Sequence, residues 1–285
     1  MTSLLLATTL FFAPADAEIA YNAASELVEK HTPRDSGTLG SRRAADFICD
    51  KLNLSGVKSK QDFFKADTPL GPRYFVNVES SFVSNTNNEW IVFISHFDTK
   101  LGVDCPGAND GASTTGLLIA LAGKLAKEKP QKTNILLLWT DGEECFDYYT
   151  ENDGLWGSKH AAKKLKDSGV KVRAVVCFDM LGDKDLKITI PDNSHQGFRE
   201  GILKIAKRKN LSNKIVAVSD IVIDDHHPFL EAGFKAIDLI DFDYGSGPGV
   251  NDYWHTPDDT IDKISRESLL FAGQVATWII NGLDR

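Results

Sequence analysis

An unbroken apolar run, Ile135-Leu136-Leu137-Leu138-Trp139, leads within one residue into Asp141-Gly142-Glu143-Glu144. A continuous apolar run of strand length indicates a strand covered on both faces, as in the sheet of an α/β protein. Ligands of such sheets bind just beyond the carboxyl ends of the strands. Adjacent glutamates there face different directions, so one can hold a metal ion while the other moves a proton. A solvated acidic turn is the commoner origin of such a cluster, so the rest of the chain has to decide.

Strands and helices alternate along the chain, without a long linker, repeat or low-complexity segment. Besides the opening run, we expect strands at 75–79, 90–95, 172–178, 188–190, 215–218 and 236–240. Helices are expected at 20–31, 41–54, 112–129, 155–167, 196–209 and 264–283. This order predicts a single α/β domain, in which a mostly parallel central sheet is flanked by helices on both faces.

Charge and cysteine usage exclude some classes of function. The net charge of -8 argues against a nucleic-acid partner, which needs a basic face. The four cysteines show no C-x-x-C spacing, so a structural zinc cluster is not expected. Because three of the four lie in or beside apolar segments, we expect buried free thiols rather than disulfides.

The N-terminus is typical of a processing signal. Leu4 to Ala13 is apolar, and Ala15-Asp16-Ala17 places small residues at the positions of a cleavage site, although no Lys or Arg precedes Lys30. We therefore expect residues 1–17 to be a signal peptide and the protein to be periplasmic or secreted. The stretch is too short to span a membrane, so the mature chain should carry no integral membrane segment. We also expect a monomer.

Potential metal ligands gather at the ends of the expected strands and in the nearby loops: His96, Asp98, Asp110, Glu143, Glu144, Asp179 and His255. Each alone is weak evidence, because a lone loop histidine is usually a surface residue and Asp110 could simply cap a helix. Their shared position at one rim of the sheet raises the odds. Zinc favours histidine nitrogens and carboxylate oxygens, and a catalytic site leaves one position open. The spare glutamate would then be the general base or acid.

Five ordered motifs carry a resemblance to a known family: His96-Phe97-Asp98-Thr99, Gly107-Ala108-Asn109-Asp110-Gly111, Asp141-Gly142-Glu143-Glu144, Phe178-Asp179 and Trp254-His255-Thr256. From about Arg34 to the C-terminus the chain resembles the zinc aminopeptidase superfamily. Within it, the chain resembles the animal-type glutaminyl-peptide cyclotransferases (glutaminyl cyclases). The resemblance implies a three-layer α/β/α fold and a zinc-dependent catalytic domain at residues 18–285.

Local differences favour the cyclase branch. Asp224-Asp225-His226-His227-Pro228-Phe229 resembles a cyclase motif with two aspartates, where peptidases usually carry serine in place of Asp224. The segment 143–160 and Trp254 also match the cyclase pattern. The chain departs from that pattern at Tyr149, where a tryptophan is expected, and at Asp238, where a histidine is expected.

The resemblance implies specific roles. Asp110, Glu144 and His255 would bind a single zinc ion, and Glu143 would be the proton shuttle. Asp224 and Asp179 would hold the shuttle and the substrate by hydrogen bonds, and Tyr149 and Trp254 would form the pocket walls. The implied reaction converts N-terminal glutamine of peptides or proteins to pyroglutamate with release of ammonia, with zinc as the Lewis acid.

Two alternatives remain. In a di-zinc aminopeptidase, Asp110 would bridge two metal ions, His96 and Asp179 would hold the second, and Glu143 would activate a metal-bound water. A non-enzymatic binding module would keep the fold and lose the chemistry. It predicts a damaged set of site residues, whereas all the key positions here are intact.

Overall fold

The computed structural model describes residues 9–84, 88–128 and 132–284. Within these ranges, eight strands form one sheet in the order β1-β2-β4-β3-β5-β8-β6-β7. The strands are β1 (Lys60–Ala66), β2 (Arg73–Phe82), β3 (Glu89–His96), β4 (Asn134–Thr140), β5 (Lys171–Asp179), β6 (Ile188–Ile190), β7 (Ile215–Ala217) and β8 (Ala236–Ile240). The helices are α1 (Pro14–His31), α2 (Leu39–Leu54), α3 (Thr114–Lys127), α4 (Trp156–Ser168), α5 (Gln196–Arg208), α6 (His226–Glu231) and α7 (Arg266–Leu283).

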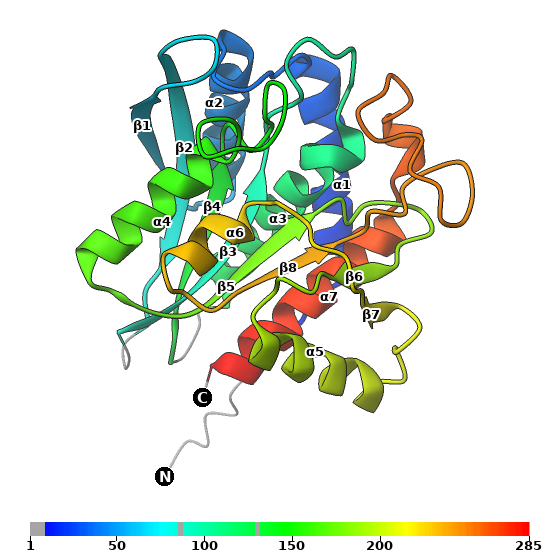
Figure 1. Cartoon of the computed structure of the whole chain (residues 1–285). Coiled ribbons are helices and arrows are strands. Elements are labelled where there is room, and N and C mark those ends of the chain that lie inside the picture. Colours follow the sequence, from blue (N-terminus) through cyan, green and yellow to red (C-terminus); the bar gives the residue numbers. More distant parts are fainter. Residues whose placement is uncertain (1–8, 85–87, 129–131, 285) are drawn as a thin grey trace.

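Helices cover both faces of the sheet (Figure 1). One face packs against α1, α2, α3, α5 and α7, and the other against α4 and α6. The central pairs β4–β3, β3–β5 and β5–β8 are parallel, whereas β1–β2, β2–β4 and β6–β8 are antiparallel. The predicted fold class is confirmed, with antiparallel pairs toward the margins of a parallel centre.

The opening apolar run is β4, and it is buried on both faces as predicted. Ile135, Leu137 and Trp139 belong to the core beneath α1 and α3, while Leu136 and Leu138 belong to the core beneath α4. Each residue of the strand is buried, and the next residue, Asp141, is also fully buried. The strand therefore carries the acidic segment that follows it to the edge of a covered sheet, not into a solvated turn.

Two elements were not predicted from the sequence, and one helix begins later than predicted. β1 is half exposed and pairs only with β2, so it lacks a clear apolar signal. α6 is only six residues long. α3 begins at Thr114 instead of residue 112, because Ala108–Ser113 form a π-type turn in which Gly111 has φ +89°. Lys129, the expected end of that helix, lies outside the described residues.

The N-terminal segment packs against the C-terminal helix. Phe12 is fully buried, and the backbone of Leu10 exchanges two hydrogen bonds with the side chain of Asn281 in α7. α1 begins at Pro14, earlier than expected, and Ala17 at the predicted cleavage position is buried within it. Residues 1–8 of the predicted signal lie outside the described residues.

The four cysteines are free, and Cys105, Cys145 and Cys177 are buried while Cys49 is half-buried. The expectation of buried free thiols therefore fits three of the four. None of the helices in the described ranges combines the length and the apolar character that crossing a membrane requires.

Candidate active site

Neighbouring strands end at the same edge of the sheet and bring their polar residues together. His96 at the end of β3 pairs in register with Thr140 at the end of β4, so the segment after β4 lies beside His96. Asp179 ends β5, the neighbour of β3 on its other side. This convergence is what the parallel centre of the sheet predicts.

Asp110, Glu144 and His255, the three predicted zinc ligands, lie close together. Nε2 of His255 is 2.8 Å from Oε1 of Glu144 and 3.1 Å from Oδ2 of Asp110. One potential ligand atom from each residue lies within 4.8 Å of the others. We call these three residues the Asp110–Glu144–His255 triad.

The triad fits a cation. Oε2 of Glu144 is buried and has no hydrogen-bond partner among the described residues. Burial and the neighbouring Asp110 raise the pKa of Glu144 to about 7. Burial lowers the pKa of His255, but hydrogen bonds to Asp110 and Glu144 outweigh it and raise the value to about 10. In the absence of an ion, the two raised pKa values mean that protons balance the carboxylates. A divalent ion held by one nitrogen and two oxygens would take the place of those protons.

Asp259 fixes the turn that carries Asp110. Its carboxylate accepts hydrogen bonds from the backbone N–H groups of Asn109 (2.7 Å) and Asp110 (3.1 Å) and from the hydroxyl of Tyr244 (2.6 Å). The fully buried Arg34 guanidinium donates to the carbonyl oxygens of Phe97, Pro106 and Gly107 around the same turn. Gly111 is required there, because a Cβ atom would lie 2.9 Å from the His96 ring and φ is positive.

Asp98 orients the two adjacent glutamates. Its oxygens accept hydrogen bonds from the backbone N–H groups of Glu143 and Glu144, both at 3.2 Å, and from the hydroxyl of Ser36 at 2.5 Å. Its distance to Nδ1 of His96 is longer, at 3.7 Å. The sequence placed Asp98 among the potential metal ligands, whereas in the structure it chiefly supports the backbone of the glutamates.

Glu143 is buried beside the triad but does not belong to it. Burial raises the pKa of its carboxyl well above the ordinary value; the neighbouring charge of His96 opposes this rise, and those of Glu144 and Asp224 add to it. The hydroxyl of Tyr149 donates a 2.9 Å hydrogen bond to Oε1. The raised pKa makes the carboxylate of Glu143 a stronger proton acceptor than an ordinary glutamate, which suits a general base.

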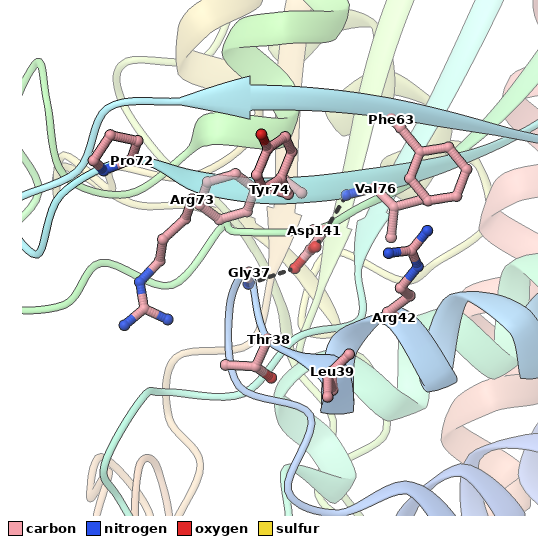
Figure 2. Close-up of a pocket in the computed structure, with 11 residues that line it drawn as sticks. Gly37, Thr38, Leu39, Arg42, Phe63, Pro72, Arg73, Tyr74, Val76 and Asp141 are labelled. Atoms are coloured by element: carbon pink, nitrogen blue, oxygen red, sulfur yellow. Dashed lines mark hydrogen bonds between the residues drawn. The ribbon is translucent and has the colours of Figure 1, made fainter.

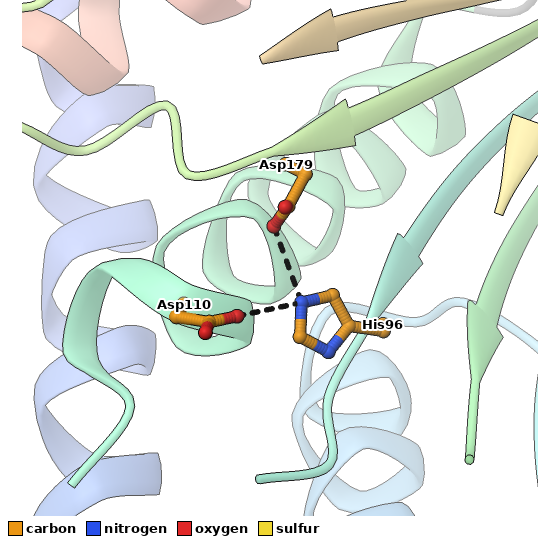
Figure 3. Close-up of side chains that lie close together, drawn as sticks. All are labelled: His96, Asp110 and Asp179. Atoms are coloured by element: carbon orange, nitrogen blue, oxygen red, sulfur yellow. Dashed lines mark hydrogen bonds and ion pairs between the residues drawn. The ribbon is translucent and has the colours of Figure 1, made fainter. Parts of the chain in front are cut away.

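A second group of potential ligands shares Asp110 with the triad (Figure 3). Nε2 of His96 lies 3.1 Å from Oδ1 of Asp110 and 3.2 Å from Oδ1 of Asp179. Burial lowers the pKa of His96, but its hydrogen bonds to Asp110, Asp179 and Asp98 raise it well above the ordinary value. Asp110 thus presents one oxygen to each group, which is the position that a bridging ligand would occupy.

A cavity of about 260 Å³ opens onto the triad. Every predicted catalytic, triad and pocket residue lines it: Asp110, Glu143, Glu144, Tyr149, Asp179, Asp224, Trp254 and His255. The ring of Trp254 stacks on the ring of His255, with centroids 3.9 Å apart. His96 is buried behind this lining, as are His226 and Asp238.

The apolar wall of the cavity was not predicted. Ile221, Val222 and Ile223 line it from the loop before α6, together with Ile240 and Phe242 from the end of β8. Ile221 is 72% exposed and, with Val222 and Ile223, forms a contiguous apolar surface at the mouth of the cavity, and contiguous apolar surface of this kind marks binding sites. An apolar triplet placed directly before Asp224, outside any strand or helix, is the signal that could have revealed this wall.

A separate cavity of about 340 Å³ is lined by Asp141 (Figure 2). Its lining includes Arg42, Phe63, Arg73 and Tyr74 from α2 and the β1–β2 hairpin, and no predicted site residue. Asp141 at its base accepts hydrogen bonds from the N–H groups of Gly37 and Val76 and from the hydroxyl of Ser41. These bonds tie the acidic segment after β4 to α2 and β2.

Comparisons with known proteins identify the family of the chain. Residues 77–279 match peptidase family M28. The structure of a glutaminyl cyclase from an Acidobacteriales bacterium is 32% identical, covers 99% of both chains and superposes with a TM-score of 0.88. Glutaminyl-peptide cyclotransferase of Drosophila melanogaster is 27% identical over 81% of this chain and 72% of its own length.

A peptidase relative is also similar. Aminopeptidase YwaD of Bacillus subtilis is 28% identical over 93% of this chain and 56% of its own length. Its identity and the shares of the two chains that are covered are lower than those of the bacterial cyclase. The chain is a member of peptidase family M28 and, within it, of the glutaminyl cyclases.

Proposed function

We propose that this protein is a glutaminyl-peptide cyclotransferase, which converts N-terminal glutamine of peptides or proteins to pyroglutamate and releases ammonia. The observation that carries this proposal is that Asp224 lines the same cavity as Glu143 and the triad. A cavity with a metal site, a proton carrier and a further carboxylate can hold both ends of a glutamine residue. The glutaminyl cyclases among the similar proteins support the same choice.

The proposed cofactor is one zinc ion held by the Asp110–Glu144–His255 triad. When bound, zinc supplies Lewis-acid polarisation of the carbonyl of the glutamine side chain. The donor set of one histidine and two carboxylates suits zinc, and three protein ligands would leave a fourth position for the substrate.

Glu143 carries out the proton transfers. The α-amine must be neutral to attack the side-chain carbonyl carbon, so Glu143 accepts its proton and later returns one to the departing nitrogen. The new C–N bond closes the ring, the old C–N bond breaks, and ammonia leaves. Because the cavity holds amine and carbonyl of one residue together, the nucleophile is the substrate itself and no activated water is needed.

Asp224 and Asp179 position the reacting groups. Both line the cavity, and both are acceptors that can hold N–H groups of the substrate. We assign Asp224 to the leaving amide nitrogen and Asp179 to the hydrogen bonds that hold the substrate and the shuttle. Tyr149, Trp254 and the apolar wall enclose the methylene groups of the glutamine side chain.

Replacing Glu143 tests the assignment. Glu143→Gln is expected to lower kcat by about 10²- to 10⁴-fold, the usual value of a general acid–base group, with the metal still bound. The matched control is Glu151→Gln, an exposed position in the same loop, which should keep full activity. Full activity of Glu143→Gln would rule out this role for Glu143.

A di-zinc aminopeptidase is the second candidate, favoured by one observation. The His96, Asp110 and Asp179 group can hold a second ion, with Asp110 as the bridge (Figure 3). Metal analysis of the purified protein separates the two functions, because one zinc per chain supports the cyclase and two support the peptidase. An activity assay with a glutamine peptide and a leucine anilide makes the same distinction: turnover of the glutamine peptide supports the cyclase, and hydrolysis of the anilide supports the peptidase.

Two further proposals concern the protein in its cell. We propose that it works in the periplasm or outside the cell and as a monomer. N-terminal sequencing of the protein recovered from separated cell fractions tests the first proposal. Light scattering of the purified protein tests the second.

A further inference from the structure

Two buried carboxyl groups lie against each other behind the cavity. Asp238 on β8 pairs in register with Cys177 on β5, and Asp224 precedes α6 on the same face of the sheet. A side-chain atom from each of Cys177, Asp224 and Asp238 lies within 4.8 Å of the others. All three side chains are at least 98% buried. Two carboxylates this close in a dry site cannot both stay ionised without a counter-charge.

The two carboxyl groups have different hydrogen-bond partners. Oδ1 of Asp224 accepts from the backbone N–H of Asp225, and Oδ2 accepts from the thiol of Cys177 at 3.3 Å. Neither oxygen of Asp238 accepts a hydrogen bond from any N–H, O–H or S–H donor in the described ranges. Donors stabilise the ionised form of a carboxyl group, so Asp224 is the better carboxylate and Asp238 the better neutral acid.

The nearest basic side chain does not supply a counter-charge. Nδ1 of His226 lies 4.0 Å from Oδ2 of Asp238, but neither ring nitrogen has a hydrogen-bond partner in the described part of the chain. Burial lowers the pKa of His226 to about 3, so the ring is neutral at pH 7. The titratable groups that face Asp238 from β5, α6 and the loop before α6 are Cys177, Asp179, Asp224, Asp225 and His226. The charge of His96 on β3 lowers the pKa of Asp224 and so favours Asp224 as the ionised member of the pair.

We propose that Asp238 is a positioning residue that keeps its proton and donates a hydrogen bond to Asp224. Asp224 lines the cavity and Asp238 does not, so Asp238 acts only through Asp224. Burial and the charge of Asp224 raise the pKa of Asp238 well above its ordinary value, while burial and Asp179 raise that of Asp224 only to about 6. A neutral acid behind Asp224 fixes the orientation of a carboxylate that faces the substrate. This effect on catalysis rests on the proposed function.

Two substitutions separate positioning from mere packing. Asp238→Asn keeps the shape and can donate from its amide, so kcat should stay close to that of the wild type. Asp238→Leu keeps the volume but removes the donor, so kcat should fall by about 10- to 100-fold, the value of one hydrogen bond to a charged group, with little change in KM. Equal activities of the two variants would overturn the proposal.

Infrared spectroscopy of the zinc-loaded enzyme tests the proton without any activity assay. The difference spectrum between the wild type and Asp238→Asn at pH 8 should contain the carbonyl band of one protonated carboxylic acid. Asp241→Asn, a buried carboxyl just beyond the same strand that is absent from the cavity lining, should leave that band in place. A difference spectrum without the band would overturn the proposal.

Metal analysis of the same samples tests the competing explanation, in which the Cys177, Asp224 and Asp238 cluster binds a cation. The wild type and Asp238→Asn should contain equal amounts of zinc. Loss of an ion from Asp238→Asn would show that the cluster holds a cation instead of a proton and would overturn the proposal. If the infrared band is present but the wild type does not cyclise glutamine peptides, the proposed function fails while the protonation of Asp238 stands.

Discussion

The hydroxyl group of Tyr149 lies 2.9 Å from Oε1 of Glu143 and donates a hydrogen bond to it. The loop between them holds this geometry, because Asp153 accepts hydrogen bonds from the N–H groups of Phe146 and Asp147. Burial raises the pKa of Tyr149 well above its ordinary value, and the charges of the glutamates add to this, so the phenol remains a donor. Tyr149 therefore contacts the proposed proton shuttle itself and is more than a wall of the pocket.

Removing this hydroxyl should slow the reaction. Tyr149→Phe is expected to lower kcat/KM by about 10- to 100-fold, since a hydrogen bond to a charged group is worth about 1.5–3 kcal/mol. The neighbouring Tyr148 is 75% exposed, and Tyr148→Phe is the matched control. Steady-state kinetics with a glutamine peptide measure both variants. Similar rates for the two would mean that the bond to Glu143 does not contribute to catalysis.

Asp259 should control metal affinity without touching the metal. Its carboxylate holds the N–H groups of Asn109 and Asp110, and burial raises its pKa to about 6, with Asp110 contributing. Asp259→Asn can accept only with one oxygen, so we expect metal affinity to fall about 10- to 100-fold, as for other residues that orient ligands. Competition with a chelating dye measures this affinity. The control Asp262→Asn, at an exposed position nearby, should bind as the wild type does.

Strand ends in a parallel sheet fix where side chains gather, so the sequence predicted the edge at which the polar residues meet, whereas the choice of Asp110, Glu144 and His255 as the triad came from the family resemblance. His96, Thr140 and Asp179 lie at one edge for that reason. The hydrogen bonds that hold the loops in place could not be predicted in the same way. Asp98 and Asp259 act by accepting backbone N–H groups, and the path of a loop backbone is not encoded in residue spacing.

The remaining differences in the fold have similar physical causes. β1 is a half-exposed edge strand, so neither continuous nor strictly alternating apolar residues mark it. The start of α3 depends on a turn with positive φ at Gly111, which a helical pattern through residue 112 conceals. Ile221, Val222 and Ile223, which form the apolar wall of the cavity, belong to a loop without regular structure. No helical or strand periodicity in the sequence therefore predicts this wall.

Asp241 should make stability fall as the pH rises. The carboxyl group is 99% buried, and burial raises its pKa from 3.8 to about 7 despite a hydrogen bond from the N–H of Lys187. Between these values the folded state binds more protons than the unfolded state, so the free energy of unfolding falls with pH and levels off above 7. The loss is on the order of a few kcal/mol.

Asp241→Asn should remove that dependence, because an amide does not titrate in this range. Urea denaturation at pH 5 and pH 8 should show a smaller difference in the variant than in the wild type. The exposed Asp258 provides a control for the change in net charge alone. If Asp241→Asn and Asp258→Asn changed the dependence equally, the buried carboxyl group would not be its source.

In a chain that keeps residues 9–17, this N-terminal segment should contribute directly to stability. Phe12 is fully buried against α7, where a Cβ atom at Gly273 would overlap its ring. Phe12→Ala should cost about 3–5 kcal/mol in urea denaturation, as for other buried aromatic residues, and a chain that starts at residue 18 should lose at least as much. Gly273→Ala should destabilise the wild type but much less the Phe12→Ala variant, because contacting residues are not additive. Phe11 is 54% exposed, so a loss of stability in Phe11→Ala equal to that in Phe12→Ala would contradict this role.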